Sequence, residues 1–325
     1  MRPGAPLRIG TRSSALAVWQ TERIRALLRG TGWETDRLEI KTTGDLTPDV
    51  PLARIGSRSL FTKQIDDALL DGRIDLAVHS LKDLPTQLPA GLTIAAVGAR
   101  DDPRDALVGR GPLRWTGLPR GALVATSSLR RRAQLLNLRP DLVVVDVRGN
   151  VDSRLAKLNA RPDWTAIVLA AAGLVRLGLG DRIGERLSPE VLLPAPGQGA
   201  LAVTVRADDH EIADVVRRAV HDEASALAVA AERGFLRRLE GGCQVPVAAY
   251  AELDGTSLVR GLRLRGRVVS LNGARAVQGQ ETGSSSDEAE AAHLGVALAE
   301  RLLSQGAADI LAEVRSSVIP PIPEP

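Results

Sequence analysis

Short apolar runs alternate with helix-length amphipathic segments through the first two-thirds of the chain. One helix is predicted from about Ser14 to Leu28, where Ala17, Ile24 and Leu28 share a face. The apolar runs predict strands at residues 7–10, 38–40, 75–78, 122–125, 142–147, 166–170 and 200–205. Strands separated by helices are typical of βαβ units with a mainly parallel sheet, and such sheets bind ligands at the carboxyl ends of their strands.

The pattern changes near residue 220. A helix is predicted from about Glu223 to Glu240, with apolar residues at four-residue spacing, namely Leu227, Ala231, Phe235 and Leu239. Alternating positions then predict strands at 245–253, 257–264 and 268–271, and two helical patterns continue to about Val314. Strands grouped beside helices indicate a small α+β domain.

Two stretches interrupt the pattern and predict domain joints: the charged, proline-broken segment 100–105 and the proline- and glycine-rich segment 193–199. The strand predicted after the second joint can return to the first domain, which gives two connections between two α/β domains. The predicted domains are residues 4–99 plus 199–217, residues 104–195, and an α+β domain at 221–316. The proline-rich tail 317–325 is expected to be disordered.

The composition, with 44% hydrophobic and 25% charged residues, is that of a soluble globular protein. No apolar run approaches the roughly 18 residues of a membrane span, and no signal-peptide core follows Met1. Together with a single cysteine, these features favour the cytoplasm. Aromatic residues make up only 2% of the chain, so it has few of the stacking surfaces that single-strand nucleic-acid binders use.

Arginines follow several predicted strands, close to the starts of helices, at Arg12, Arg130, Arg131, Arg148, Arg154 and Arg176. Helix N-termini expose unpaired N–H groups and the positive end of the dipole, so arginines there favour a site for several negative charges. Each arginine alone can equally be a solvated surface charge. In the helix after Ser128, the buried stripe is expected to be Leu129, Ala133 and Leu136, so that Arg130 and Arg131 project off it. No Walker A or dinucleotide glycine motif occurs, and carboxylates fit such a pocket as well as phosphates.

Asp83 follows the third predicted strand beside Lys82, at the same edge of the sheet. A carboxylate among cations can stabilise a cationic intermediate or transfer a proton, and it can equally form a loop salt bridge or a helix cap. His79 lacks metal-ligand spacing and is interpreted as a structural residue. Asp45 holds a similar position after the second strand, and residues 46–59 are expected to form a mobile lid.

Cys243 is the only cysteine of the chain. A lone thiol cannot form an internal disulfide and cannot by itself build a zinc site, which leaves packing or sulfur nucleophilicity. A buried free cysteine is the commoner case. However, Gly241 and Gly242 let the backbone turn after the predicted helix, which favours a sulfur on a loop.

Nine motifs occur in order along residues 7–314: Arg8–Ser14, the Phe61 segment, His79–Pro85, Asp101–Asp105, Thr126–Arg131, Arg148–Val151, Ala172–Leu174, Pro196–Ala200 and Leu239–Pro246. In these the chain resembles the porphobilinogen deaminase, or hydroxymethylbilane synthase, family. The resemblance implies two periplasmic-binding-protein-like α/β domains and a small C-terminal α+β domain. It also implies head-to-tail condensation of four porphobilinogen molecules with release of ammonia, on a dipyrromethane cofactor held by a thioether to Cys243, followed by hydrolytic release of hydroxymethylbilane.

The resemblance also implies roles for individual residues. Asp83 matches the catalytic aspartate, which assists loss of the amine and stabilises the azafulvenium cation. Besides Cys243 and Asp83, the residues that match cofactor contacts are Lys82, Thr126, Ser128, Arg130, Arg131 and Arg154. Those that match substrate contacts are Arg12, Ser14, Gln20, Arg148, Arg154, Arg176 and Gln198. The family commonly has lysine where Arg58 stands in the predicted lid, and no metal, nucleic acid or membrane is implied for an expected monomer.

Two other functions remain open on the residues alone. Solute-binding proteins for polycarboxylates share the two-lobed architecture and need no thiol at position 243. A nucleic-acid-binding or regulatory protein would place its arginines on phosphates and bind with a steep salt dependence. Intact mass distinguishes the enzyme, because it predicts a dipyrrole adduct that is absent from Cys243→Ser.

Overall fold

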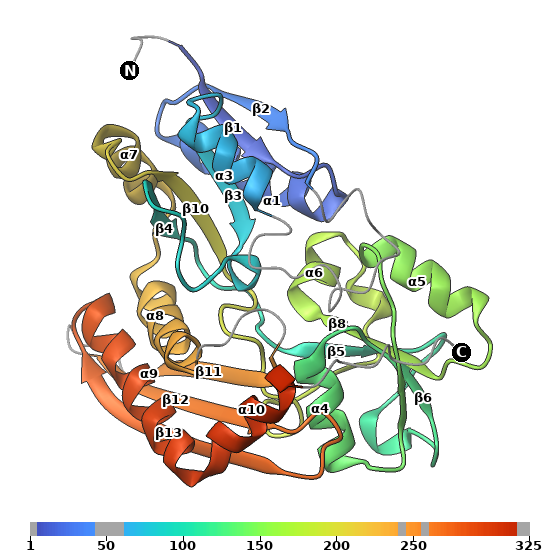
Figure 1. The fold of residues 1–325 in the computed structure, drawn as a ribbon. Coiled ribbons are helices and arrows are strands. Elements are labelled where there is room, and N and C mark those ends of the chain that lie inside the picture. Colours follow the sequence, from blue (N-terminus) through green and yellow to red (C-terminus); the bar gives the residue numbers. More distant parts are fainter. Residues whose placement is uncertain (1–4, 43–61, 240–244, 255–259, 317–325) are drawn as a thin grey trace.

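The computed structural model describes residues 5–42, 62–239, 245–254 and 260–316 (Figure 1). Asp45, Arg58, Cys243, the lid predicted at 46–59 and the tail at 317–325 lie outside these residues. Within them, three sheets each pack against helices around a hydrophobic core of their own. We call the three units the first, second and third lobe.

The first lobe is built on a five-stranded sheet in the order β2-β1-β3-β10-β4. Its strands are β1 (Leu7–Thr11), β2 (Thr35–Glu39), β3 (Leu76–Ser80), β4 (Leu92–Val97) and β10 (Leu201–Arg206). Its helices are α1 (Ala15–Gly30), α3 (Lys63–Leu70) and α7 (His210–Val220). β1 is parallel to β2 and β3, whereas β10 is antiparallel to its neighbours β3 and β4. The predicted helix at 14–28 is confirmed, with Ile24 and Leu28 buried against the sheet.

The second lobe has a five-stranded sheet in the order β7-β6-β8-β5-β9. Its strands are β5 (Asp105–Val108), β6 (Leu123–Ala125), β7 (Val143–Val145), β8 (Ala166–Ala170) and β9 (Glu185–Arg186). Its helices are α4 (Leu129–Leu138), α5 (Val151–Ala160) and α6 (Ala171–Arg176). β6 is parallel to β7 and β8, and β5 is antiparallel to β8 and β9. Both sheets are therefore mainly parallel, as the alternation of strands and helices predicts.

Two segments connect these lobes. The first crossover, residues 98–104, leads from β4 to β5, and the second crossover, residues 194–200, leads back to β10 in the first sheet. The two crossovers are joined where Asp101 donates its N–H to the Gly199 carbonyl oxygen at 3.2 Å. The residue boundaries of the three domains stay a prediction.

The third lobe consists of an antiparallel sheet, β11 (Val247–Asp254), β12 (Arg260–Val269) and β13 (Ala276–Ser285), covered by helices. The helices are α8 (Glu223–Arg238), α9 (Glu288–Leu302) and α10 (Ala308–Ser316), with a π-helical turn at Leu303–Ala307. The separate strands predicted at 257–264 and 268–271 are wrong, because β12 runs without a break across residues 265–267. β13 escaped prediction because, apart from Val277, glycine and polar residues occupy its half-buried positions.

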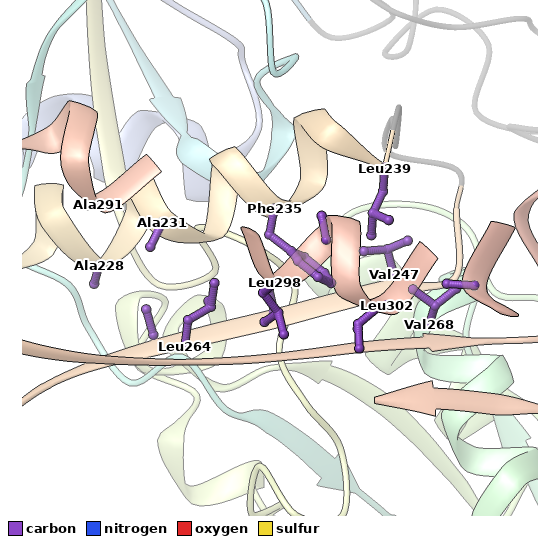
Figure 2. Close-up of a cluster of buried hydrophobic side chains, with 14 of the residues drawn as sticks. Ala228, Ala231, Phe235, Leu239, Val247, Leu264, Val268, Ala291, Leu298 and Leu302 are labelled. Atoms are coloured by element: carbon purple, nitrogen blue, oxygen red, sulfur yellow. The ribbon is translucent and has the colours of Figure 1, made fainter. Parts of the chain in front are cut away.

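The core of the third lobe lies between α8, α9 and the sheet (Figure 2). The four residues predicted to form the apolar face of the helix, Leu227, Ala231, Phe235 and Leu239, are all buried there. Two glycines allow the helices to approach closely. A Cβ atom on Gly295 of α9 would overlap the Ala231 carbonyl oxygen of α8, and one on Gly234 of α8 would overlap the Ala292 carbonyl oxygen of α9.

Candidate active site

Asp83 lies at the end of a short 3₁₀ turn, Leu81–Asp83, that directly follows β3. It lines a cavity of about 80 Å³ together with three other residues that the sequence singles out, Arg12, Ser14 and Gln20. Ser14 caps α1 by accepting the Ala17 N–H at 3.3 Å. The cavity therefore forms where β1 and β3 end and α1 begins, at the sheet edge where a ligand is expected.

Three further residues of this cavity, Thr62, His79 and Ser80, were not predicted as part of a site. The Gln20 side-chain amide donates to the Ser80 hydroxyl at 2.8 Å, which orients Gln20 along the wall. His79 is buried and its Nε2 lies 3.1 Å from the Thr204 hydroxyl. Burial, and next the charge of Arg12, lower the pKa of His79 to about 4, so its ring is neutral at pH 7. The structural interpretation of His79 is confirmed, since its ring is paired inside the sheet.

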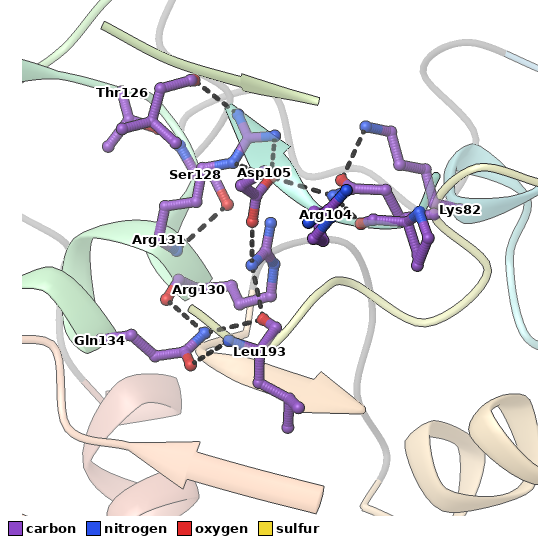
Figure 3. A network of polar contacts seen from close by, with 12 residues as sticks. Lys82, Arg104, Asp105, Thr126, Ser128, Arg130, Arg131, Gln134 and Leu193 are labelled. Atoms are coloured by element: carbon purple, nitrogen blue, oxygen red, sulfur yellow. Dashed lines mark hydrogen bonds and ion pairs between the residues drawn. The ribbon is translucent and has the colours of Figure 1, made fainter. Parts of the chain in front are cut away.

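A second group of polar residues joins the first and second lobes through Asp105 (Figure 3). The Asp105 carboxylate is fully buried and binds Arg130 at 2.8 Å and Arg131 at 2.7 Å. It also accepts the side-chain amide of Gln198 at 2.9 Å. Gln198 in turn accepts a hydrogen bond from Lys82 Nζ at 3.2 Å, so that the residue beside Asp83 is connected to the arginine pair.

The expectation that Arg130 and Arg131 project off the buried face of their helix is wrong. The buried residues of α4 are Arg130, Arg131, Ala133, Gln134 and Leu135, and of the predicted stripe only Ala133 is among them. The reason is that Asp105, together with the carbonyl oxygens of Leu193 and Val168, satisfies the guanidinium groups inside the protein. Buried cations are tolerated when they are paired in this way.

The charges of this group act on one another. Burial alone would raise the pKa of Asp105, but the charges of Arg130 and Arg131 hold that pKa well below its usual range. Burial lowers the pKa of Lys82 to about 8; Asp83 partly offsets this effect, and Arg131 and Arg130 add to it. Lys82 is therefore a cation that negative charges on a ligand would stabilise.

Arg148 and Arg154 come from the turn after β7 and from α5, whose start is capped by Asn150. Arg154 donates its Nε to the Gly149 carbonyl oxygen at 2.8 Å. Burial, followed by the charge of Arg131, lowers the pKa of Arg154 to about 10, and the charges of Arg148 and Asp83 also act on it. The Arg148 Nη1 atom is buried and has no hydrogen-bond partner among the residues that the structure describes. An unpaired buried donor of this kind is suited to an anionic ligand.

The remaining predicted residues occupy different positions. Thr126 is buried and its hydroxyl accepts the Ser128 N–H at 3.3 Å, while the Ser128 hydroxyl caps α4 by accepting the Arg131 N–H at 3.4 Å. Arg176, at the end of α6, donates hydrogen bonds to Asp101 and Gly199 in the two crossovers.

The described part of the chain contains no group of three or more His, Cys, Asp or Glu residues placed to hold a metal ion. Nor does it contain a helix long and apolar enough to cross a membrane.

Comparison with known proteins gives matches over nearly the whole chain. Residues 7–214 match the family model "Porphobilinogen deaminase, dipyromethane cofactor binding domain", and residues 226–304 match "Porphobilinogen deaminase, C-terminal domain". The chain is 53% identical to the porphobilinogen deaminase of Rubrobacter xylanophilus, over 95% of its own length and 97% of the relative's. It is 50% identical to that of Moorella thermoacetica, over the same shares of the two chains. The chain belongs to the porphobilinogen deaminase family.

As a porphobilinogen deaminase, the chain is a transferase of tetrapyrrole biosynthesis with hydroxymethylbilane synthase activity. It joins four porphobilinogen molecules head to tail on a dipyrromethane cofactor and releases linear hydroxymethylbilane. A periplasmic substrate-binding protein from Coxiella burnetii is similar in structure over 67% of the chain and 93% of its own, with 15% identity and a TM-score of 0.43.

The described residues fit the cofactor of a porphobilinogen deaminase. A dipyrromethane that is built from two such pyrroles carries four carboxylates, because each pyrrole has an acetate and a propionate. The structure gathers Lys82, Arg130, Arg131 and Arg154 within the network described above, where Asp105 binds both Arg130 and Arg131, and where Asp83 and Asp146 act on Lys82 and Arg154. Lys82 and Arg154 are half-buried, so the carboxylates of an anionic ligand can reach them and offset the cost of their burial.

Proposed function

We propose that Asp83 is the catalytic residue of this porphobilinogen deaminase. The observation that carries the proposal is the place of Asp83 on the wall of a cavity that it shares with Arg12, Ser14 and Gln20. An arginine there can bind a substrate carboxylate through two parallel hydrogen bonds. Asp83 can at the same time accept a hydrogen bond from the pyrrole N–H, which orients the ring with its aminomethyl group in the cavity.

The chemistry requires a negative charge beside the substrate ring. The aminomethyl group reacts in its protonated form: when its C–N bond breaks, the electron pair leaves with the nitrogen as ammonia and the substrate ring becomes cationic. The Asp83 carboxylate stabilises this positive charge, and it can accept the proton that is lost when the new carbon–carbon bond forms. A carboxylate held at a fixed place for a charge that develops during the reaction lowers the barrier most effectively.

We further propose that the residues between the lobes hold the cofactor. Cys243 anchors it, Lys82, Arg130, Arg131 and Arg154 bind its carboxylates, and Thr126 and Ser128 donate hydroxyl hydrogen bonds, with Asp83 beside its rings. When bound, the dipyrromethane supplies the nucleophilic ring carbon from which the chain grows. The substrate and the growing chain are bound by Arg12, Ser14, Gln20, Arg148, Arg176 and Gln198, and also by Arg154, which has both roles.

The test compares Asp83→Asn with Asp83→Glu in the holoenzyme. Asparagine keeps the size of the side chain and removes its charge, so we expect turnover to fall at least about 100-fold, the usual size of such an effect. Intact mass should still show the cofactor on most molecules. Glutamate restores the charge at a shifted position and should recover part of the rate. Turnover of Asp83→Asn within a few-fold of the parent would remove Asp83 from this role.

Finer properties of the enzyme follow from the same chemistry. We propose that it works as a monomer, and that it works in the cytoplasm, where the Cys243 thiol stays reduced until the cofactor is attached. We also propose that it needs no metal ion, since arginine and lysine side chains supply the positive charge that the carboxylates require. Light scattering tests the monomer, and full activity after dialysis against a chelator tests the independence from metal.

A further inference from the structure

Trp19 is an exposed aromatic residue in a chain that has very few aromatic side chains. It is 37% exposed and lies on α1, the helix that begins beside Arg12 and that carries Gln20. Its ring lies 5.6 Å from the guanidinium carbon of Arg176, which belongs to α6 in the second lobe. α1 and α6 face each other across the two lobes (Figure 1). An arginine within about 6 Å of a tryptophan ring is attracted by its π-electrons.

The Arg176 guanidinium, on which this ring stacks, is held in place by hydrogen bonds. Its side chain is 5% exposed, Nε donates to Asp101 Oδ2 at 2.8 Å, and Nη2 donates to the Gly199 carbonyl oxygen at 2.6 Å. Asp101 belongs to the first crossover and Gly199 to the second. Arg176 therefore ties both crossovers to α6, and Trp19 adds α1 of the first lobe to the same point.

The two helices also approach each other closely one turn earlier. A Cβ atom on Gly173 of α6 would lie 3.6 Å from Leu16 Cδ2 of α1, an ordinary van der Waals contact. Leu16 and Trp19 are three residues apart and therefore lie on the same face of α1. The contact between the lobes at this place therefore includes Leu16 and Trp19 of α1 and Gly173 and Arg176 of α6.

We propose that Trp19 is a positioning residue, which by stacking on Arg176 holds the first-lobe cavity against the arginines of the second lobe. Trp19 itself touches neither substrate nor cofactor in this proposal. It acts through α1, because a shift of that helix moves Arg12, Ser14 and Gln20 together. The proposal rests on the proposed function insofar as these residues bind porphobilinogen, but the contact between the lobes can be measured without activity.

The test uses the holoenzyme with Trp19→Leu, Trp19→Phe and, as a control, Val175→Ala, a residue of α6 that is 50% exposed and outside this contact. Loss of a partly exposed cation–π contact should lower the equilibrium constant for the contact between α1 and α6 by about two- to five-fold. We expect Trp19→Leu to raise KM for porphobilinogen by about that factor, with kcat changed less than twofold and the cofactor fully attached. Trp19→Phe keeps an aromatic ring and should have a KM close to that of the parent, and the KM of Val175→Ala should equal that of the parent.

A second measurement separates positioning from catalysis. Fluorescent labels on the first and second lobes should report a larger or broader distance distribution in Trp19→Leu than in the parent, with or without substrate. The proposal is overturned if both KM and the distance distribution match the parent. It is also overturned if Trp19→Leu lowers kcat, cofactor content and melting temperature together, because that pattern describes a folding defect. A changed distance distribution with an unchanged KM would keep the contact between the lobes and count only against the proposed binding of porphobilinogen by Arg12, Ser14 and Gln20.

Discussion

Arg100 and Glu232 form an ion pair, with Arg100 Nη1 2.7 Å from Glu232 Oε1, that binds the first crossover to α8 of the third lobe. The Glu232 carboxylate is fully buried and also accepts the N–H of Gly197 at 2.7 Å and that of Ala251 at 2.8 Å. Gly197 belongs to the second crossover and Ala251 to β11. One carboxylate therefore joins both connections between the α/β lobes to the third lobe, whose sequence contains Cys243, the proposed attachment residue.

Glu232→Gln should destabilise the protein strongly. It leaves the Arg100 guanidinium, whose side chain is only 10% exposed, without a counter-ion, and breaking a buried pair in this way costs about 3–5 kcal/mol. Urea unfolding followed by circular dichroism measures the loss. Arg263→Gln is the matched control, because Arg263 pairs with Glu252 at 3.0 Å in an exposed position, where a pair contributes at most about 1 kcal/mol. Equal losses for the two variants would contradict this account.

Asp105→Asn should destabilise the protein, because the positive charges of Arg130 and Arg131 then repel each other without the carboxylate between them. Arg130 and Arg131 are bound to this one carboxylate, so its loss should cost about 3–5 kcal/mol of unfolding free energy at pH 7. The pKa of Asp105 is held well below its usual range, so the stabilisation is present above the unfolded value of about 3.9 and is lost as pH falls toward the folded value. The difference between parent and variant should therefore stay constant from pH 7 to 5 and shrink only below about pH 4. A difference that shrinks between pH 7 and 5 would show that Asp105 titrates there.

The burial of Arg130 and Arg131 shows where prediction from the sequence stops. Ser14 and Ser128 were placed at helix starts, because capping depends on residues within the same turn. The partner of the two arginines, Asp105, comes from a strand that begins 25 residues before Arg130, and no local pattern connects the two. An arginine on a helix is therefore read as exposed until its tertiary partner is known. Asp105 could not be predicted as a site residue for the same reason: its partners are distant in the sequence, and it stands out only as part of the charged segment 100–105.

The strands and helices were predicted best where burial is apolar. β8 and the apolar face of α8 follow directly from their hydrophobic residues. β13 is an edge strand in which glycine and polar residues follow Val277, so its alternation carries almost no hydrophobic signal, and the apolar pattern does not predict it. The cavity could be predicted only in part, since Arg12 and Asp83 carry recognisable charge, whereas Thr62 and Ser80 are common polar residues that tertiary structure brings to the wall.

Lys82 should titrate near pH 8 in the apoenzyme. Burial lowers its pKa to about 8, so the amine loses its charge between pH 7 and 9. Anionic cofactor carboxylates nearby would favour the charged form and raise this value. NMR of ¹³C-methylated lysines in Cys243→Ser, which lacks the attachment thiol, measures the pKa, and Lys82→Arg identifies the signal. A Lys82 signal with the same midpoint in Cys243→Ser and in the holoenzyme would show that Lys82 does not meet the cofactor.

The same shift predicts how stability changes with pH. The unfolded lysine keeps its proton up to about pH 10.4, whereas folded Lys82 loses it from about pH 8, so the folded apoenzyme binds fewer protons in this window. Stability should therefore rise with pH between 8 and 10 relative to Lys82→Met, which has no charge to lose. Denaturant unfolding of the two proteins at pH 7, 8, 9 and 10 measures the trend. A gap between them that is independent of pH would contradict the lowered pKa.

Gly295→Ala should separate α8 from α9. The added methyl group would overlap the Ala231 carbonyl oxygen and come within 2.5 Å of the Phe235 backbone nitrogen, and these backbone atoms cannot move without shifting α8. Overpacking of this kind costs about 1–3 kcal/mol, and we expect the loss to appear as increased hydrogen exchange at Leu298 and Phe235. Gly30→Ala is the control, because Gly30 ends α1 and no atom lies within 4 Å of its added methyl group.

Because Glu232 lies on α8 between Ala231 and Phe235, a shift of this helix should also disturb the ion pair of Glu232 with Arg100. Gly295→Ala and Glu232→Gln should therefore be less destabilising together than the sum of their separate effects, and strict additivity would show that the close packing of α8 on α9 does not position Glu232.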